Sequence, residues 1–151
     1  MNMRYALRSE DTEQINVVSW CNWNRREHPE LELLHHCPNG GSRNKAEAVK
    51  LKQMGVLAGV PDLHLPVPKG AYTGLYIEMK YDKGKIEKSQ RDFLNLAAGY
   101  GNYCVVCYGA DAAIEIIREY VNLKPIDTGK RENLMKIPNG SILKEGKVKP
   151  L

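Results

Sequence analysis

Apolar and polar residues alternate strictly in two short stretches, and this alternation predicts strands with one buried face. In residues 75–80, Leu75, Ile77 and Met79 fall on one side and the residues between them on the other. Residues 63–65 show the same pattern over a shorter length. Prolines and glycines separate the two stretches and favour a hairpin connection, so we expect the two strands to pair.

Four other stretches have the spacing and the boundary residues of helices. We interpret Asp11 with Gln14 as a capping box for the first helix, and we place N-caps at Ser89 and Asp111 for the third and the fourth. The second helix is followed by Gly55, which suits a C-terminal cap. The predicted helices cover residues 11–27, 44–54, 90–99 and 112–121.

Two further strands complete the predicted fold. Residues 31–37 form a short apolar segment that leads into the turn residues 38–41, and residues 103–108 form an apolar run. The order of elements is therefore αβαββαβα, which predicts an α/β fold with a mixed β-sheet flanked by helices. We expect one catalytic domain over residues 1–124. Residues 125–151, rich in proline, glycine and basic residues, are expected to be a basic C-terminal extension without much core of its own.

Charge and cysteine content narrow the functional classes. The net charge of +4 suits a polyanionic partner without requiring one. No apolar run is long enough to span a bilayer and the first ten residues do not resemble a signal peptide, so we expect a soluble cytoplasmic protein with no membrane partner. Cys104 and Cys107 are three residues apart on a predicted strand and face opposite ways, which favours core residues over zinc ligands.

The candidate chemistry lies on the predicted hairpin. Glu78 and Lys80 are two residues apart on a strand, so their side chains project from the same face. If the strand that follows Asp62 pairs with this strand, a second carboxylate converges on that face. Carboxylates can hold Mg²⁺ or Mn²⁺, and a lysine beside the ion can orient or deprotonate a water molecule or neutralise charge on phosphorus. This group predicts phosphodiester hydrolysis.

Several short sequence motifs around this group resemble those of the virus-type replication-repair nuclease (VRR-NUC) branch of the PD-(D/E)XK nuclease superfamily. The resemblance covers roughly residues 10–122. It implies a restriction-endonuclease-like core. The motifs on which the resemblance rests are Pro61-Asp62, Glu78-Met79-Lys80, His35-His36-Cys37-Pro38-Asn39-Gly40-Gly41, Lys52-Gln53-Met54-Gly55, Glu10-Asp11-Thr12-Glu13-Gln14 and Ser89-Gln90.

The resemblance also implies roles for individual residues. Asp62 and Glu78 would bind the metal, the backbone carbonyl of Met79 would complete its ligands, and Lys80 would act on the attacking water. Two further catalytic roles follow from the resemblance alone. Glu13 would be the first-helix acid that holds metal or orders the water, and Gln90 would be a supporting residue.

Candidate DNA contacts lie in two loops. The turn at Asn39, Gly40 and Gly41 could serve only as a tight connection, or its backbone N–H groups could approach a phosphate with Arg43 close by. The second candidate set consists of Lys83, Lys85 and Lys88. These lysines could belong to a solvated loop, or they could bind the phosphates of DNA.

From these residues and this resemblance we expect a Mg²⁺- or Mn²⁺-dependent endodeoxyribonuclease. The stand-alone phage and bacterial members of the branch resemble Holliday-junction resolvases, which implies branched DNA as substrate, a homodimer, and a bacterial or phage-infected host cytoplasm. The alternatives are a catalytically idle DNA-binding module of the same fold and a flap or nonspecific nuclease. A restriction-type enzyme would need a base-reading insertion, and none is visible in 151 residues.

Overall fold

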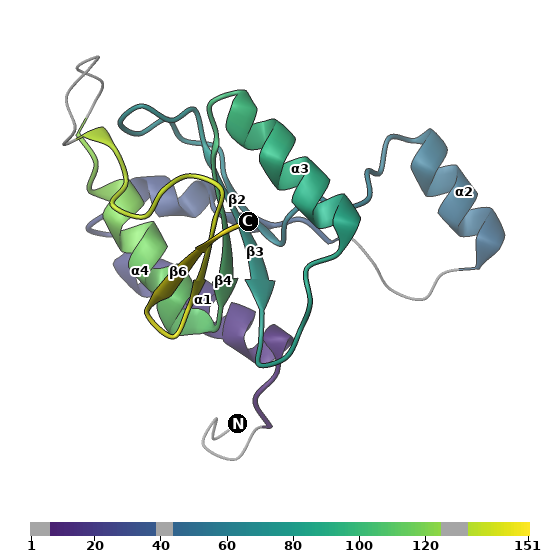
Figure 1. Cartoon of the computed structure of the whole chain (residues 1–151), viewed down its shortest axis with the longest axis horizontal. Coiled ribbons are helices and arrows are strands. Elements are labelled where there is room, and N and C mark those ends of the chain that lie inside the picture. Colours follow the sequence, from purple (N-terminus) through teal and green to yellow (C-terminus); the bar gives the residue numbers. More distant parts are fainter. Residues whose placement is uncertain (1–6, 39–43, 125–132) are drawn as a thin grey trace.

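The structure is a computed structural model that describes residues 7–38, 44–124 and 133–151. These residues form a mixed six-stranded sheet flanked by helices, as predicted (Figure 1). The strands are β1 (His35–His36), β2 (Leu63–Leu65), β3 (Leu75–Lys80), β4 (Tyr103–Tyr108), β5 (Ser141–Lys144) and β6 (Lys147–Pro150). The helices are α1 (Glu10–Asn24), the 3₁₀ helix η2 (Pro29–Leu33), α2 (Lys45–Gln53), α3 (Lys88–Gly99) and α4 (Ala110–Val121).

The strands lie in the sheet in the same order as in the chain. β1, β2 and β3 are antiparallel neighbours, so the predicted hairpin between β2 and β3 is confirmed. β3, β4 and β5 are parallel, and the connections between them contain α3 and α4. β6 returns antiparallel to β5.

Each face of the sheet has its own apolar layer. On one face, Ile77 and Met79 pack with residues of α1 and α4, while on the other face Val106 packs with Leu94 of α3. Cys104 and Cys107 belong to opposite layers, and both are fully buried free thiols. The prediction that these cysteines are core residues facing opposite ways is therefore confirmed.

The helices begin at other residues than the sequence pattern suggested. The capping box of α1 is formed by Ser9 and Thr12, not by Asp11 and Gln14. α3 begins after Glu87, and α4 begins after a glycine, with the expected caps already inside the first turns. These starts differ from prediction by one or two residues because several polar residues at each boundary are competent to cap, and tertiary contacts select among them.

The segment before β1 is helical rather than extended. Pro29 opens η2 and Leu31 is fully buried, whereas only His35 and His36 pair as a strand. The prediction of a strand from residue 31 was therefore wrong over most of its length. Proline suits the first turn of a helix because its ring holds φ near the helical value.

The C-terminal segment contributes to the sheet and to the core. β5 adds to β4, and Met135, Ile137 and Leu143 are buried against the layer that contains α1 and α4. The expectation of an extension without much core was wrong for residues 133–151. Glu145 and Gly146 both have positive φ in a two-residue turn, a conformation that glycine adopts easily and glutamate rarely, so a hairpin was not predictable there from the residue types.

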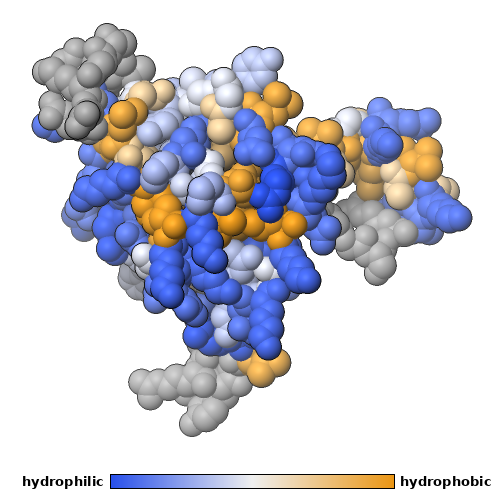
Figure 2. All heavy atoms as spheres, in the orientation of Figure 1, coloured by the Kyte–Doolittle hydropathy of each residue, from blue (hydrophilic) through white to orange (hydrophobic). Residues whose placement is uncertain are grey.

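α2 projects from the rest of the molecule (Figure 1). The helix lies within the predicted range 44–54 and is capped by Asn44, but it has no buried residue. Figure 2 shows hydrophobic atoms on this arm, and Val49 and Met54 are among its exposed apolar residues. No helix within the described ranges is long and apolar enough to cross a membrane.

Candidate active site

Asp62 lies directly before β2 and is held by three hydrogen bonds. Its carboxylate oxygen Oδ2 accepts from the backbone N–H of Met79 at 2.8 Å. Its backbone oxygen accepts from the N–H of Cys37 at 2.9 Å and lies 2.7 Å from Nδ1 of His36. The antiparallel pairing of β2 with β3 thus places this carboxylate beside the carboxyl end of β3.

Glu78 and Lys80 lie side by side on β3, as the strand alternation predicted. Their side chains are almost completely buried, and Nζ of Lys80 is 3.5 Å from Oε1 of Glu78. The other carboxylate oxygen of Glu78, Oε2, is buried and has no hydrogen-bond partner within the described part of the chain. A buried carboxylate oxygen without a partner is costly, so the site is incomplete as it stands.

A third carboxylate, from the first turn of α1, completes the group. Carboxylate oxygens of Glu10, Asp62 and Glu78 all lie within 4.8 Å of one another. The predicted residue from this helix was Glu13, and the structure does not bring it into this group. Glu10 and Glu13 are three positions apart on the helix, and only the position of the helix end relative to the sheet decides which of them reaches the site.

The three carboxylates repel one another. Burial, reinforced by the charge of Asp62 and opposed by Lys80, raises the pKa of Glu78 to about 8. Burial also raises the pKa of Glu10, with Lys80 again opposing and Asp62 reinforcing the shift. A divalent cation would offset this repulsion because it is a larger positive charge than one lysine.

These residues fit a hard divalent cation. Three carboxylates supply the oxygen ligands that Mg²⁺ and Mn²⁺ prefer, and one of them, Glu78, has a buried oxygen, Oε2, without a partner in the described part of the chain. The cluster is partly open, since Glu10 and Asp62 are only partly buried. An ion held there would therefore be accessible to a substrate.

Comparison with known families agrees with this geometry. The family model of the VRR-NUC domain matches residues 4–111, which is most of the chain. The chain belongs to the VRR-NUC family. A solved structure described as a VRR_NUC domain protein is 35% identical, covers 81% of this chain and 95% of its own, and superposes with a TM-score of 0.68. No curated protein matches the chain.

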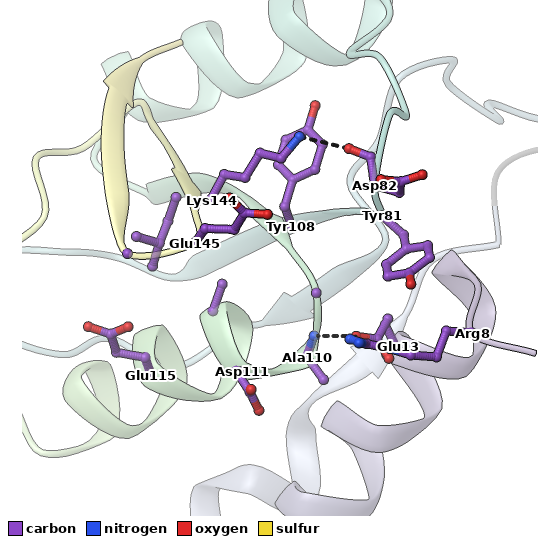
Figure 3. Close-up of a pocket in the computed structure, with 14 residues that line it drawn as sticks. Arg8, Glu13, Tyr81, Asp82, Tyr108, Ala110, Asp111, Glu115, Lys144 and Glu145 are labelled. Atoms are coloured by element: carbon purple, nitrogen blue, oxygen red, sulfur yellow. Dashed lines mark hydrogen bonds and ion pairs between the residues drawn. The ribbon is translucent and has the colours of Figure 1, made fainter. Parts of the chain in front are cut away.

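In this VRR-NUC protein, Glu13 lies in a different environment from the carboxylate cluster (Figure 3). Its Oε1 accepts a 2.6 Å bond from the guanidinium of Arg8 and a 3.4 Å bond from the N–H of Ala110, the first residue of α4. It lines a hollow of about 390 Å³ at the carboxyl ends of the parallel strands. Its contacts are those of a side chain that caps the start of α4.

Gln90 lies on the first turn of α3, close to the chain that leads to Asp62. Its Oε1 accepts from the N–H of Glu87, so this oxygen completes the helix cap. Gly59 packs directly against this turn: a Cβ there would lie 2.2 Å from the backbone oxygen of Ser89. The close approach requires glycine and fixes α3 relative to the residues preceding β2.

The predicted DNA contacts have different outcomes in this VRR-NUC protein. Lys83 and Lys85 are exposed on the loop after β3, whereas Lys88 pairs with Asp92 one turn later on α3. The other predicted contacts lie outside the described residues: Asn39, Gly40, Gly41 and Arg43.

Proposed function

We propose that this VRR-NUC protein is a Mg²⁺- or Mn²⁺-dependent endodeoxyribonuclease. The observation that carries the proposal is the unpartnered, buried oxygen of Glu78 inside a group of three carboxylates beside a lysine. Such a group is costly to fold, so its retention favours a bound cation over a passive DNA-binding surface.

Glu10, Asp62 and Glu78 would hold the ion, and the backbone carbonyl of Met79 is the further ligand that family resemblance implies. When bound, the ion supplies Lewis-acid stabilisation of charge on phosphorus and lowers the pKa of water. The chain itself holds the ligands in place: the N–H of Met79 fixes the Asp62 carboxylate, and the strand fixes Glu78.

Lys80 would orient or deprotonate the attacking water and neutralise the negative charge that develops on the phosphate. Its amine is buried at the edge of the cluster, where low dielectric strengthens its attraction for a phosphate oxygen. Its neighbour Glu78 holds the amine within 3.5 Å and so restricts its direction. Gln90 supports the site through the start of α3.

We further propose branched DNA as the substrate and a homodimer as the working form. Both proposals rest on kinship with the stand-alone members of the branch. Two sites related by a two-fold axis would allow paired cuts in a symmetric junction. Sedimentation analysis of the free protein and of its junction complex tests the dimer, and a monomer in both would remove it.

The decisive experiment compares four-way junction, flap, nicked and linear duplex DNA in Mg²⁺, in Mn²⁺ and in EDTA. The wild-type protein is expected to cut the junction only with a divalent cation. Asp62→Asn, Glu78→Gln and Lys80→Ala are each expected to lower the cleavage rate by about a hundredfold or more. Lys124→Ala, which changes an exposed lysine after α4, is the matched control.

The products also separate the alternatives. A protein that binds these DNAs but cuts none of them is an idle DNA-binding module, and the proposal of a nuclease fails. Preference for the flap, or equal cutting of all substrates, removes the resolvase-like specificity while the metal chemistry stands. Full activity in one variant removes that residue from the site.

A further inference from the structure

Three lysines of the C-terminal hairpin lie on the same face of the sheet as the carboxylate cluster. Tyr108, Ile142 and α3 residues share one apolar layer, so they mark this face. Side chains two residues apart on a strand share a face, and so do directly paired residues on neighbouring strands. Lys144 therefore lies on this face with Ile142, as do Lys147 and Lys149, which pair with Lys144 and Ile142.

The strand register connects the lysines to the site in one row. Lys80 pairs with Tyr108, Tyr108 with Lys144, and Lys144 with Lys147. Neighbouring strands lie ~4.8 Å apart, so three steps cover ~14 Å. One nucleotide of a duplex strand advances ~3.4 Å along the axis while the strand also winds around it, so a row of this length reaches a phosphate a few nucleotides away at most.

The hairpin end of this row is hollow and basic. A cavity of about 350 Å³ is lined by Tyr108, Ile142, Lys144, Glu145, Lys147 and Lys149. Lys144 is fixed because its Nζ donates to the backbone oxygen of Asp82 at 2.8 Å and lies over the ring of Tyr108.

The other two lysines are free to bind a ligand. Lys147 and Lys149 are exposed, and neither pairs with a carboxylate within the described ranges. Lys83 and Lys85 approach from the loop after β3, which is fastened to the same row by the bond from the Tyr108 hydroxyl to the Gly84 oxygen. The hollow of Figure 3 is different in charge: it contains five acidic residues, and DNA would avoid it.

We propose that Lys147 and Lys149 bind a phosphate of the DNA strand a few nucleotides from the cut, so that the C-terminal hairpin extends the binding surface beyond the family domain. This inference rests on the proposed nuclease function. The family match ends at residue 111, so the hairpin lies outside it. Lysines on an exposed edge strand can also serve only to prevent aggregation, but here both face the site while Val148 and Pro150 face away.

The test measures the salt dependence of binding to a labelled four-way junction and a labelled linear duplex, with Ca²⁺ in place of Mg²⁺. The variant Lys147→Gln/Lys149→Gln is compared with wild type, with Lys147→Arg/Lys149→Arg, and with the control Lys124→Gln/Lys136→Gln. The control removes the same charge near the far end of α4, whose 12 residues extend ~18 Å from Lys80.

The glutamine variant is expected to lose about fivefold in affinity per lost contact at 0.15 M salt, and the slope of log K against log salt should fall by ~0.9 per contact. The arginine variant and the control should keep the wild-type slope. Equal melting temperatures check that the variants are folded. An unchanged slope in the glutamine variant overturns the inference.

A second measurement locates the phosphate. Single phosphates on both sides of the cut are replaced in turn by neutral methylphosphonates. One replacement a few nucleotides from the cut should weaken wild-type binding and have no further effect in the glutamine variant. Additive losses overturn the inference even when the wild-type protein still cuts DNA. A wild-type protein that neither binds nor cuts any DNA overturns the proposed function and the inference together.

Discussion

Two glutamates of α1 have different surroundings although only two residues lie between them. Glu10 is partly exposed and faces Asp62 and Glu78. Glu13 is buried, pairs with Arg8 and accepts from the first N–H of α4. The first arrangement suits a metal ligand and the second suits a structural cap, so substitution should separate the two roles.

Glu10→Gln is expected to reduce Mg²⁺-dependent cleavage by at least about tenfold with little change in melting temperature, because it removes a ligand. Glu13→Gln is expected to retain cleavage but to lower stability by about 1 to 2 kcal/mol, because it weakens a buried bond to a helix start. Cleavage assays and urea denaturation of both variants decide the matter. The reverse pattern would return the metal-binding role to Glu13.

Glu78 predicts an unusual pH dependence of the metal-free protein. Its pKa in the folded state, about 8, lies above its ordinary value, so the folded state binds the proton more tightly than the unfolded state. The contribution of Glu78 to the free energy of unfolding is fully present below about pH 4.5 and is lost as the pH rises through 8.

In EDTA, Glu78→Gln should therefore be more stable than wild type at pH 9, on the order of a few kcal/mol, with the difference shrinking toward pH 5. Denaturation in urea at several pH values measures this. Mg²⁺ at pH 9 should stabilise wild type more than the variant. A constant difference across the pH range would contradict the raised pKa.

Sequence alone predicted Asp62, Glu78 and Lys80 together because strand alternation and hairpin pairing are local patterns. The same reasoning could not place Glu10, because α1 reaches the site through packing with β3 and α4 across many residues of chain. The resemblance to a family pointed to Glu13 of the same helix, whereas the structure brings Glu10 to the other two carboxylates.

At the scale of elements, α2 is held by fewer interactions than the other helices. It has nine residues and none is buried, whereas α4 buries Ile116, Ile117 and Tyr120 among others. Short helices without tertiary contacts are marginal in water. Its Asn44 cap was predictable from the sequence, but the lack of packing was not, because its alanines and leucine resemble those of a buried helix.

Hydrogen exchange of the free protein should therefore show amides of α2 exchanging orders of magnitude faster than those of α4. Protection of α2 that appears only at high protein concentration would indicate that a second copy covers it. Protection equal to that of α4 in dilute protein would contradict the expected weak packing.

At the scale of the whole molecule, charge is divided between two neighbouring regions. The hollow at the carboxyl ends of the parallel strands is rich in carboxylates, and the hairpin hollow is rich in lysines. The net charge of +4 averages over both regions, which is why composition alone supports only a general preference for polyanions.

The C-terminal segment is the largest part of the fold that sequence analysis did not predict. Its strands are only four residues long, and their lysines and glycine resemble those of a loop. Partners distant in the chain order them: the hydroxyl of Tyr103 donates to the oxygen of Ile137, and Asn139 accepts from the N–H of Cys104. Long-range contacts of this kind leave no periodic signal.

A protein that ends at Lys124 should therefore fail to fold cooperatively. It loses the buried side chains of Met135, Ile137 and Leu143, each worth about 1.5 to 3 kcal/mol, against a total stability of about 5 to 15 kcal/mol for a typical domain. It also leaves β4 as an unpaired edge. Far-ultraviolet circular dichroism in urea measures the effect. Leu143→Ala should lower the free energy of unfolding by about 2 to 4 kcal/mol, and Val148→Ala, at a half-exposed position, by much less. An unchanged urea midpoint in the truncated protein would show that the core is complete without the hairpin.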